Sequence, residues 1–178
     1  MTLWTPDSYT RAWNFAADAH REQRVPGTKR PYINHLGNVA MEVMRAIAAT
    51  STVQHPDLAV QCALLHDTIE DTTVTYEVLA SRFGHEVAAG VLALSKNPAL
   101  SKNKQMADSL ERIRQQPYEV WIVKLADRIS NLQKPPGHWK LEKIRQYRAE
   151  AEMILDDLGE ANEWLAKRLE KKIFAYKV

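Results

Sequence analysis

The nine residues from 64 to 72, Leu-Leu-His-Asp-Thr-Ile-Glu-Asp-Thr, constrain this chain more than any other segment. One histidine and three carboxylates occupy six positions directly after an apolar stretch. On a helix, Glu70 follows His66 by four residues and Asp71 follows Asp67 by four, so each pair shares a face. His66 and Asp67 are only about 100° apart around the helix axis. The four side chains therefore gather at one helix end, where three carboxylates repel each other unless a positive group, such as a divalent metal, compensates.

Apolar periodicity predicts helices along the chain. The first expected helix has Thr5 as its N-cap and Pro6 in its first turn, and it ends near Gln23. After a loop at residues 24–31, rich in proline and glycine, a second helix follows. Its apolar residues have the i, i+3, i+4, i+7 spacing of an amphipathic helix: Leu36, Val39, Ala40, Val43, Met44 and Ile47.

The third expected helix, residues 58–67, is apolar nearly all round, which predicts a central, buried helix. No segment shows the alternation of a β-strand. The sequence therefore predicts an all-α fold with about eight to ten helices, in one domain spanning residues 1–178 and stacked around the helix that carries His66 and Asp67. The remaining helices are expected near residues 76–83, 85–94, 105–115, 118–133, 139–158 and 161–176.

Composition narrows the class of protein. The formal net charge is only +2, which fits a small phosphorylated ligand and requires no nucleic acid polymer. Cys62 is the single cysteine, so no intramolecular disulfide forms, and its apolar surroundings predict a core position. No apolar run approaches the roughly 20 residues of a membrane span, and the N-terminal residues do not resemble a signal peptide. We expect a cytoplasmic protein that does not bind membranes.

Two further segments carry candidate metal ligands. His35 lies at the start of the helix that includes Leu36. Asp127 and Asn131 lie four residues apart, and so on one face, in the strongly apolar segment 120–132. A carboxylate that emerges from so apolar a helix requires a partner.

These segments together resemble the HD phosphohydrolase superfamily, in which a His…His-Asp…Asp pattern holds a metal. The resemblance implies that His35, His66, Asp67 and Asp127 are the metal ligands. It also implies Mn²⁺, and the chemistry agrees, because two imidazoles and two carboxylates with added waters suit an octahedral ion. Zn²⁺ fits less well because it prefers fewer ligands, often including a thiolate.

Three phrases narrow the resemblance to the hydrolase domain of the RelA/SpoT family, over about residues 8–160: Pro-Tyr-Ile-Asn-His at 31–35, Ala-Leu-Leu-His-Asp-Thr-Ile-Glu-Asp-Thr at 63–72 and Val-Lys-Leu-Ala-Asp-Arg at 123–128. With no synthetase or regulatory domain, the chain is similar to a stand-alone small alarmone hydrolase of the metazoan SpoT-homologue kind. This implies metal-dependent removal of the 3′-pyrophosphate of (p)ppGpp, releasing GDP or GTP. Glu70 and Asp71 match the acidic pair that orients and deprotonates the attacking water.

The resemblance also implies substrate contacts. Asn131 matches a nucleotide-contacting asparagine, Tyr147 matches a tyrosine near the substrate, and Lys140 belongs to a basic cluster suited to the 5′-phosphates. Arg24 corresponds to an arginine that can stack on the base. Here Arg24-Val25-Pro26-Gly27 replaces the usual Arg-Lys-Ser/Asp-Gly run, so guanine and adenine alarmones both stay open. We interpret the remaining histidines as structural or surface residues: His20, His55, His85 and His138.

Three other functions fit this sequence less well. An HD phosphohydrolase acting on another nucleotide needs neither the acidic pair nor the Pro-Tyr-Ile-Asn-His phrase. A nucleotide sensor without catalysis does not need a complete set of ligands. A DNA-binding module lacks support because the chain has no concentrated basic stripe. The expected partner is therefore a small nucleotide, and four apolar positions on the last helix suggest a homodimer contact: Trp164, Leu165, Ile173 and Phe174.

Overall fold

The structure is a computed structural model that describes residues 3–51, 53–135 and 137–176. Within these ranges the chain forms ten α-helices and one 3-10 helix, and β-structure is limited to an isolated bridge between Arg24 and Pro31. The all-α prediction is confirmed. The helices are α1 (Pro6–Ala19), α2 (Ile33–Ala49), α3 (Pro56–Leu65), α4 (Thr68–Asp71), α5 (Tyr76–Phe83), α6 (His85–Leu94), α7 (Lys102–Arg114), α8 (Tyr118–Asn131), α9 (Leu141–Leu158), η1 (Gly159–Ala161) and α10 (Glu163–Ala175).

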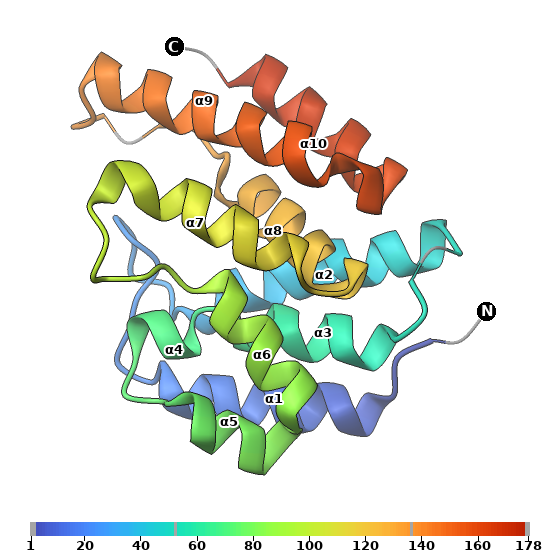
Figure 1. Cartoon of the computed structure of the whole chain (residues 1–178). Helices are drawn as coiled ribbons and strands as arrows, with labels where there is room; N and C mark the ends of the chain where they lie inside the picture. Colours follow the sequence, from blue (N-terminus) through green and yellow to red (C-terminus); the bar gives the residue numbers. More distant parts are fainter. Residues whose placement is uncertain (1–2, 52, 136, 177–178) are drawn as a thin grey trace.

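Helix α3 is the centre of the fold, as its sequence predicts. Every one of its residues except Asp57 is buried, and the helix packs against α1, α2, α6 and α8. Figure 1 shows α9 and α10 side by side at one end of the molecule and α1 and α5 at the other, with α2, α3 and α8 between them. Helix α8 is also almost wholly buried because it packs on α2, α3, α9 and α10.

Two predicted helix ends are wrong. The first helix ends at Ala19 instead of Gln23, and the chain then turns back on itself. The third helix ends at Leu65, and a short new helix, α4, starts at Thr68. At this break, two side chains make contacts with backbone carbonyl oxygens. His66 Nδ1 lies 2.8 Å from the oxygen of Ala63, and the Thr68 hydroxyl donates to the carbonyl of Leu65 over 2.7 Å. Such bonds compete with continued helix.

The dimer contact expected on the last helix is partly wrong. Leu165 and Ile173 are buried within the chain, because they belong to the face of α10 that packs on α8 and α9. Phe174 alone among the four is strongly exposed, at 88%. In the described part of the chain, no helix combines the length and the apolar character that crossing a bilayer requires.

The central position of α3 makes its stability contribution testable. Leu64 is fully buried on α3, so Leu64→Ala removes packed atoms and leaves a cavity. We expect the free energy of unfolding to fall by about 2–5 kcal/mol, measured by urea denaturation. Leu92 on α6 is 45% exposed, and Leu92→Ala is the matched control with a much smaller loss. Equal losses in the two variants would contradict the central role of α3.

Candidate metal centre and active site

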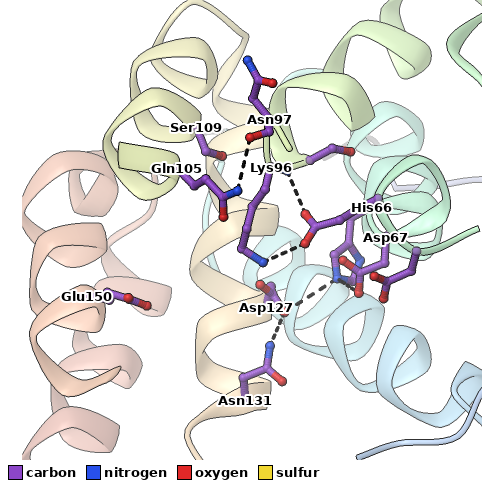
Figure 2. Close-up of polar contacts among 12 residues, drawn as sticks. His66, Asp67, Lys96, Asn97, Gln105, Ser109, Asp127, Asn131 and Glu150 are labelled. Atoms are coloured by element: carbon purple, nitrogen blue, oxygen red, sulfur yellow. Dashed lines mark hydrogen bonds and ion pairs between the residues drawn. The ribbon is translucent and has the colours of Figure 1, made fainter. Parts of the chain in front are cut away.

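Three parts of the fold bring the predicted metal ligands to one point. His35 comes from the first turn of α2, His66 and Asp67 from the break between α3 and α4, and Asp127 from α8. One Asp127 oxygen, Oδ1, lies 3.3 Å from Nε2 of His35 and 3.6 Å from Nε2 of His66. Asp67 Oδ2 lies 3.0 Å from Nε2 of His66 and 3.7 Å from Nε2 of His35. Figure 2 shows His66, Asp67 and Asp127 directed at one another.

The orientation of His66 suits a cation. Its Nδ1 faces the carbonyl of Ala63, which only accepts hydrogen bonds, so Nδ1 carries a proton and Nε2 points into the cluster. Among the described residues, this buried Nε2 has no hydrogen-bond partner. Ligand atoms of His35, His66 and Asp127 all lie within 4.8 Å of one another. The nitrogen and oxygen donors, with no thiol among them, fit a divalent metal ion.

The electrostatics of the cluster indicate the same need for positive charge. Burial by itself raises the pKa of Asp67, but the charge of His66 outweighs burial and lowers that pKa to about 2. Burial is likewise overcome at Asp127, where the neighbouring imidazoles of His35 and His66 hold the pKa well below its usual range. Burial lowers the pKa of His66, yet the two carboxylates raise it well above its ordinary value. Both carboxylates therefore remain ionised and require a cationic partner.

Tyr32 supports one of these carboxylates. Its hydroxyl donates to Oδ2 of Asp67 over 2.6 Å, and its ring is buried beside that of His35. The sequence reasoning missed this residue, although Tyr32 precedes His35 by three positions and so lies on the same side of the chain entering α2. A hydrogen bond to a metal-ligating oxygen fixes the direction in which that oxygen points.

A cavity of about 220 Å³ opens beside the cluster and gathers charged groups of both signs. Lys124 was also missed: it is buried on α8, and its Nζ lies 3.9 Å from Oδ2 of Asp127. Its only sequence signal is its position three residues before Asp127. Burial lowers the pKa of Lys124. The lining residues are Tyr32, His66, Asp67, Glu70, Asp71, Leu94, Lys96, Lys124, Asp127 and Asn131.

The acidic pair lies in this cavity, but its two members have different partners. Glu70 Oε1 binds the Lys96 ammonium over 2.7 Å, and Glu70 Oε2 accepts from the Lys96 backbone amide over 2.8 Å. Asp71 Oδ2 accepts from the side-chain amide of Gln23 over 3.0 Å. Burial opposes the charge on Lys96, but the bond to Glu70 raises its pKa. Glu70 is thus held by a cation, and Asp71 by a neutral amide.

The structure brings only one of the four predicted substrate residues into the cavity. Asn131 lines it and donates its side-chain amide to Oδ1 of Asp127 over 2.5 Å. Arg24 is exposed and donates to backbone carbonyls of its own loop. Lys140 is exposed at the start of α9. Tyr147 is half-buried under the guanidinium of Arg128, which lies 4.2 Å from the ring centre. The substrate roles of all four stay predictions.

Comparison with known proteins places this site in a family. A family model described as HD domain matches residues 12–163. The chain belongs to the HD domain family. The Danio rerio protein named guanosine-3′,5′-bis(diphosphate) 3′-pyrophosphohydrolase MESH1 is 32% identical over 163 residues, covering 89% of this chain and 88% of that protein. The human protein of the same name is 31% identical with the same coverage.

A solved structure gives the same result for the HD fold. It is described as a metazoan ortholog of SpoT that hydrolyses ppGpp, and it superimposes with a TM-score of 0.81 at 26% identity, covering 96% of both chains. These likenesses confirm the resemblance carried by the three sequence phrases. They also confirm the expected HD-type fold.

Removal of one candidate ligand tests the metal centre directly. We expect Mn²⁺ to raise the thermal unfolding midpoint of metal-stripped protein, since a ligand at 100 times its Kd stabilises by about 2.7 kcal/mol. Asp127→Ala removes an oxygen that lies within 3.6 Å of Nε2 of both histidines, so the shift should vanish. Asp157→Ala, which removes an aspartate paired with Arg114 away from the cavity, should keep the full shift. A full shift in Asp127→Ala would contradict the assignment.

Tyr32→Phe tests the support of Asp67. The variant keeps the ring and removes only the hydroxyl, so we expect metal affinity to fall roughly 10- to 100-fold, measured by isothermal titration with Mn²⁺. Tyr118→Phe is the matched control because Tyr118 also donates to a carboxylate, Glu160, but at the exposed surface far from the cavity. Unchanged affinity in Tyr32→Phe would show that Asp67 needs no such support.

Proposed function

We propose that this protein is a metal-dependent hydrolase that removes the 3′-pyrophosphate of (p)ppGpp and releases GDP or GTP. One observation carries the proposal: the cluster of two histidines and two aspartates opens onto a cavity that also holds Glu70, Asp71 and two lysines. The names of the relatives in Danio rerio and human supply the substrate class. Their coverage of nearly the whole chain supports transfer of this activity.

The cavity fits the reacting part of such a substrate. Its volume of about 220 Å³ lies below the roughly 300–1,000 Å³ typical of pockets that enclose a drug-sized ligand. It therefore accommodates the diphosphate and leaves the nucleoside outside, at the rim. Lys96 and Lys124 line the cavity and supply positive charge for the phosphate oxygens. With a neutral substrate, the buried ammonium of Lys124 would have the carboxylate of Asp127, 3.9 Å away, as its counter-charge but no anion within the cavity.

In the proposed reaction, water attacks the phosphorus atom that is bonded to the 3′ oxygen. The bond between this phosphorus and the 3′ oxygen breaks. Pyrophosphate leaves, and the 3′ oxygen takes up a proton. His35, His66, Asp67 and Asp127 would hold a divalent ion, and such an ion would supply positive charge toward a phosphoryl oxygen and toward water. From this chain, Glu70 and Asp71 orient the water and accept its proton.

We further propose Mn²⁺ as the metal. Two imidazoles and two carboxylates form a mixed nitrogen and oxygen donor set, which suits a borderline octahedral ion. The thiol that Zn²⁺ often selects is absent here, since Cys62 is buried against α6, with its sulfur near the carbonyl of Val87. A cytoplasmic location and a homodimer stay predictions.

For the nucleoside, we propose contacts from Asn131 at the cavity and from Arg24, Lys140 and Tyr147 beyond it. Asn131 uses one amide hydrogen on Asp127, and its remaining hydrogen and its oxygen are available to a ribose or phosphate group. Arg24 lies on an exposed loop, where its guanidinium plane can stack on a purine. Stacking alone does not distinguish guanine from adenine, so the base preference must be measured.

Pyrophosphate release from metal-stripped protein, with Mn²⁺ restored, tests the function. The guanine and adenine tetraphosphates are offered side by side, with Asp67→Ala as the negative control. We expect release that requires both the metal and Asp67, and the ratio of the two rates gives the base preference. Binding without release would indicate a nucleotide sensor. Release only from other nucleotides would replace the alarmone assignment with another HD phosphohydrolase activity.

The acidic pair gives a second, more local test. Asp71→Asn keeps the shape of the side chain but removes its ability to accept a proton at neutral pH. We expect kcat to fall about 10²- to 10⁴-fold, with metal binding retained because Asp71 is not among the candidate ligands. Asp108→Asn, at an aspartate paired with Arg112, is the matched control and should keep full kcat. Unreduced kcat in Asp71→Asn would remove Asp71 from the mechanism.

A further inference from the structure

A buried histidine lies behind Asp71, joined to it through one glutamine. His20 follows the last residue of α1 and is only 3% exposed. Its Nδ1 lies 2.5 Å from Oε1 of Gln23, and Nε2 of Gln23 donates to Oδ2 of Asp71 over 3.0 Å. The three side chains thus form a chain of hydrogen bonds that runs from the core at the end of α1 to the edge of the cavity.

The chemistry of the two ends fixes the direction of every bond in this chain. An ionised carboxylate only accepts hydrogen bonds, so Gln23 must present its NH₂ group to Asp71. The amide oxygen of Gln23 then faces His20, which must donate from Nδ1. A proton on Nδ1 of His20 is therefore the arrangement that matches this orientation of the Gln23 amide. Among the described residues, the buried Nε2 of His20 has no hydrogen-bond partner, so the ring is oriented through Nδ1 and Gln23.

The backbone holds both residues in place. The amide of Gln23 donates to the carbonyl of His20 over 2.9 Å, and the carbonyl of Gln23 accepts from the amide of Tyr32 over 3.1 Å. The His20 ring packs against the ring of Tyr32, with centroids 5.0 Å apart. Since Tyr32 also holds Asp67, the same buried group of side chains supports a candidate metal ligand and the acidic pair.

We propose that His20 and Gln23 are positioning residues for Asp71, an inference that rests on the proposed hydrolase function. Gln23 occupies Oδ2 of Asp71, and among the described residues Oδ1 accepts no hydrogen bond. One oxygen is thus fixed, and the other is free to receive the proton of the attacking water. Both oxygens of Glu70 are engaged by Lys96, which makes Glu70 the residue that orients.

Gln23→Glu separates the two bonds of this chain. The variant keeps an oxygen for His20 but replaces the NH₂ group beside Asp71 with a second carboxylate, which repels it. We expect kcat for the preferred tetraphosphate to fall roughly 10- to 100-fold, while KM changes less than about twofold because Gln23 acts on the chemical step. Gln23 is only half-buried, so the variant should fold normally, which thermal unfolding checks.

Gln61→Glu is the matched control. Gln61 also bridges two groups, because its Oε1 accepts from Arg11 and its Nε2 donates to the carbonyl of Asp57, but it lies away from the cavity. We expect kcat and KM of this variant to match those of the unchanged protein. Equal kcat in Gln23→Glu and Gln61→Glu would overturn the proposal.

A double-variant comparison tests whether His20 acts through Gln23. His20→Ala alone should lower kcat, but in a Gln23→Ala background it should change kcat less than about twofold, because coupled residues are not additive. Independent, multiplying effects would overturn the role of His20. These outcomes are distinct from failure of the proposed function, which would appear as no turnover in the unchanged protein. Urea denaturation of each variant separates loss of folding from loss of positioning.

Discussion

The structure depends on the charge balance where α3 ends. Asp67 and Asp127 are mostly buried beside His35 and His66, and an uncompensated buried carboxylate costs several kcal/mol. The fold accepts this cost because its surroundings are arranged for a cation. His66 is turned by the carbonyl of Ala63, and Asp67 is held by Tyr32. The break between α3 and α4 belongs to the same arrangement, since it lets two consecutive residues face one point.

Sequence reasoning located the helices and the residues of the candidate metal centre, but not the break between α3 and α4 that lets these residues meet. Residues 85–94 form the helix that the pattern predicts, because Gly84 marks its start and apolar periodicity continues through it. The end of α3 was misplaced because periodicity carries no information about a hydrogen bond such as that of Thr68 with Leu65. Leu165 was assigned to the surface for a similar reason, since a helix pattern does not say which neighbours cover each face.

The four predicted substrate residues show that a sequence match does not by itself place a side chain in the cavity. Asn131 reaches the cavity because it shares the rigid face of α8 with Asp127. Arg24 and Lys140 stand outside regular helix, where side-chain direction depends on the whole loop and not on spacing. His20 carried no sequence signal of its own beyond a glutamine three residues later. Its importance comes from burial and from Asp71, 48 positions beyond Gln23 and brought close only by tertiary packing.

The two acids differ in what a phosphate does to them. Glu70 shares the ammonium of Lys96, so a substrate phosphate that binds Lys96 competes with Glu70 for the same charge. Gln23 is neutral, so a substrate phosphate does not compete with Asp71 for Gln23 as it competes with Glu70 for Lys96. A proton acceptor benefits from such a support, because its position then stays fixed as the substrate arrives. Glu70, which orients the water, can instead change its contact with Lys96 when the substrate binds. The unequal partners of Glu70 and Asp71 therefore divide between them the two tasks that hydrolysis requires.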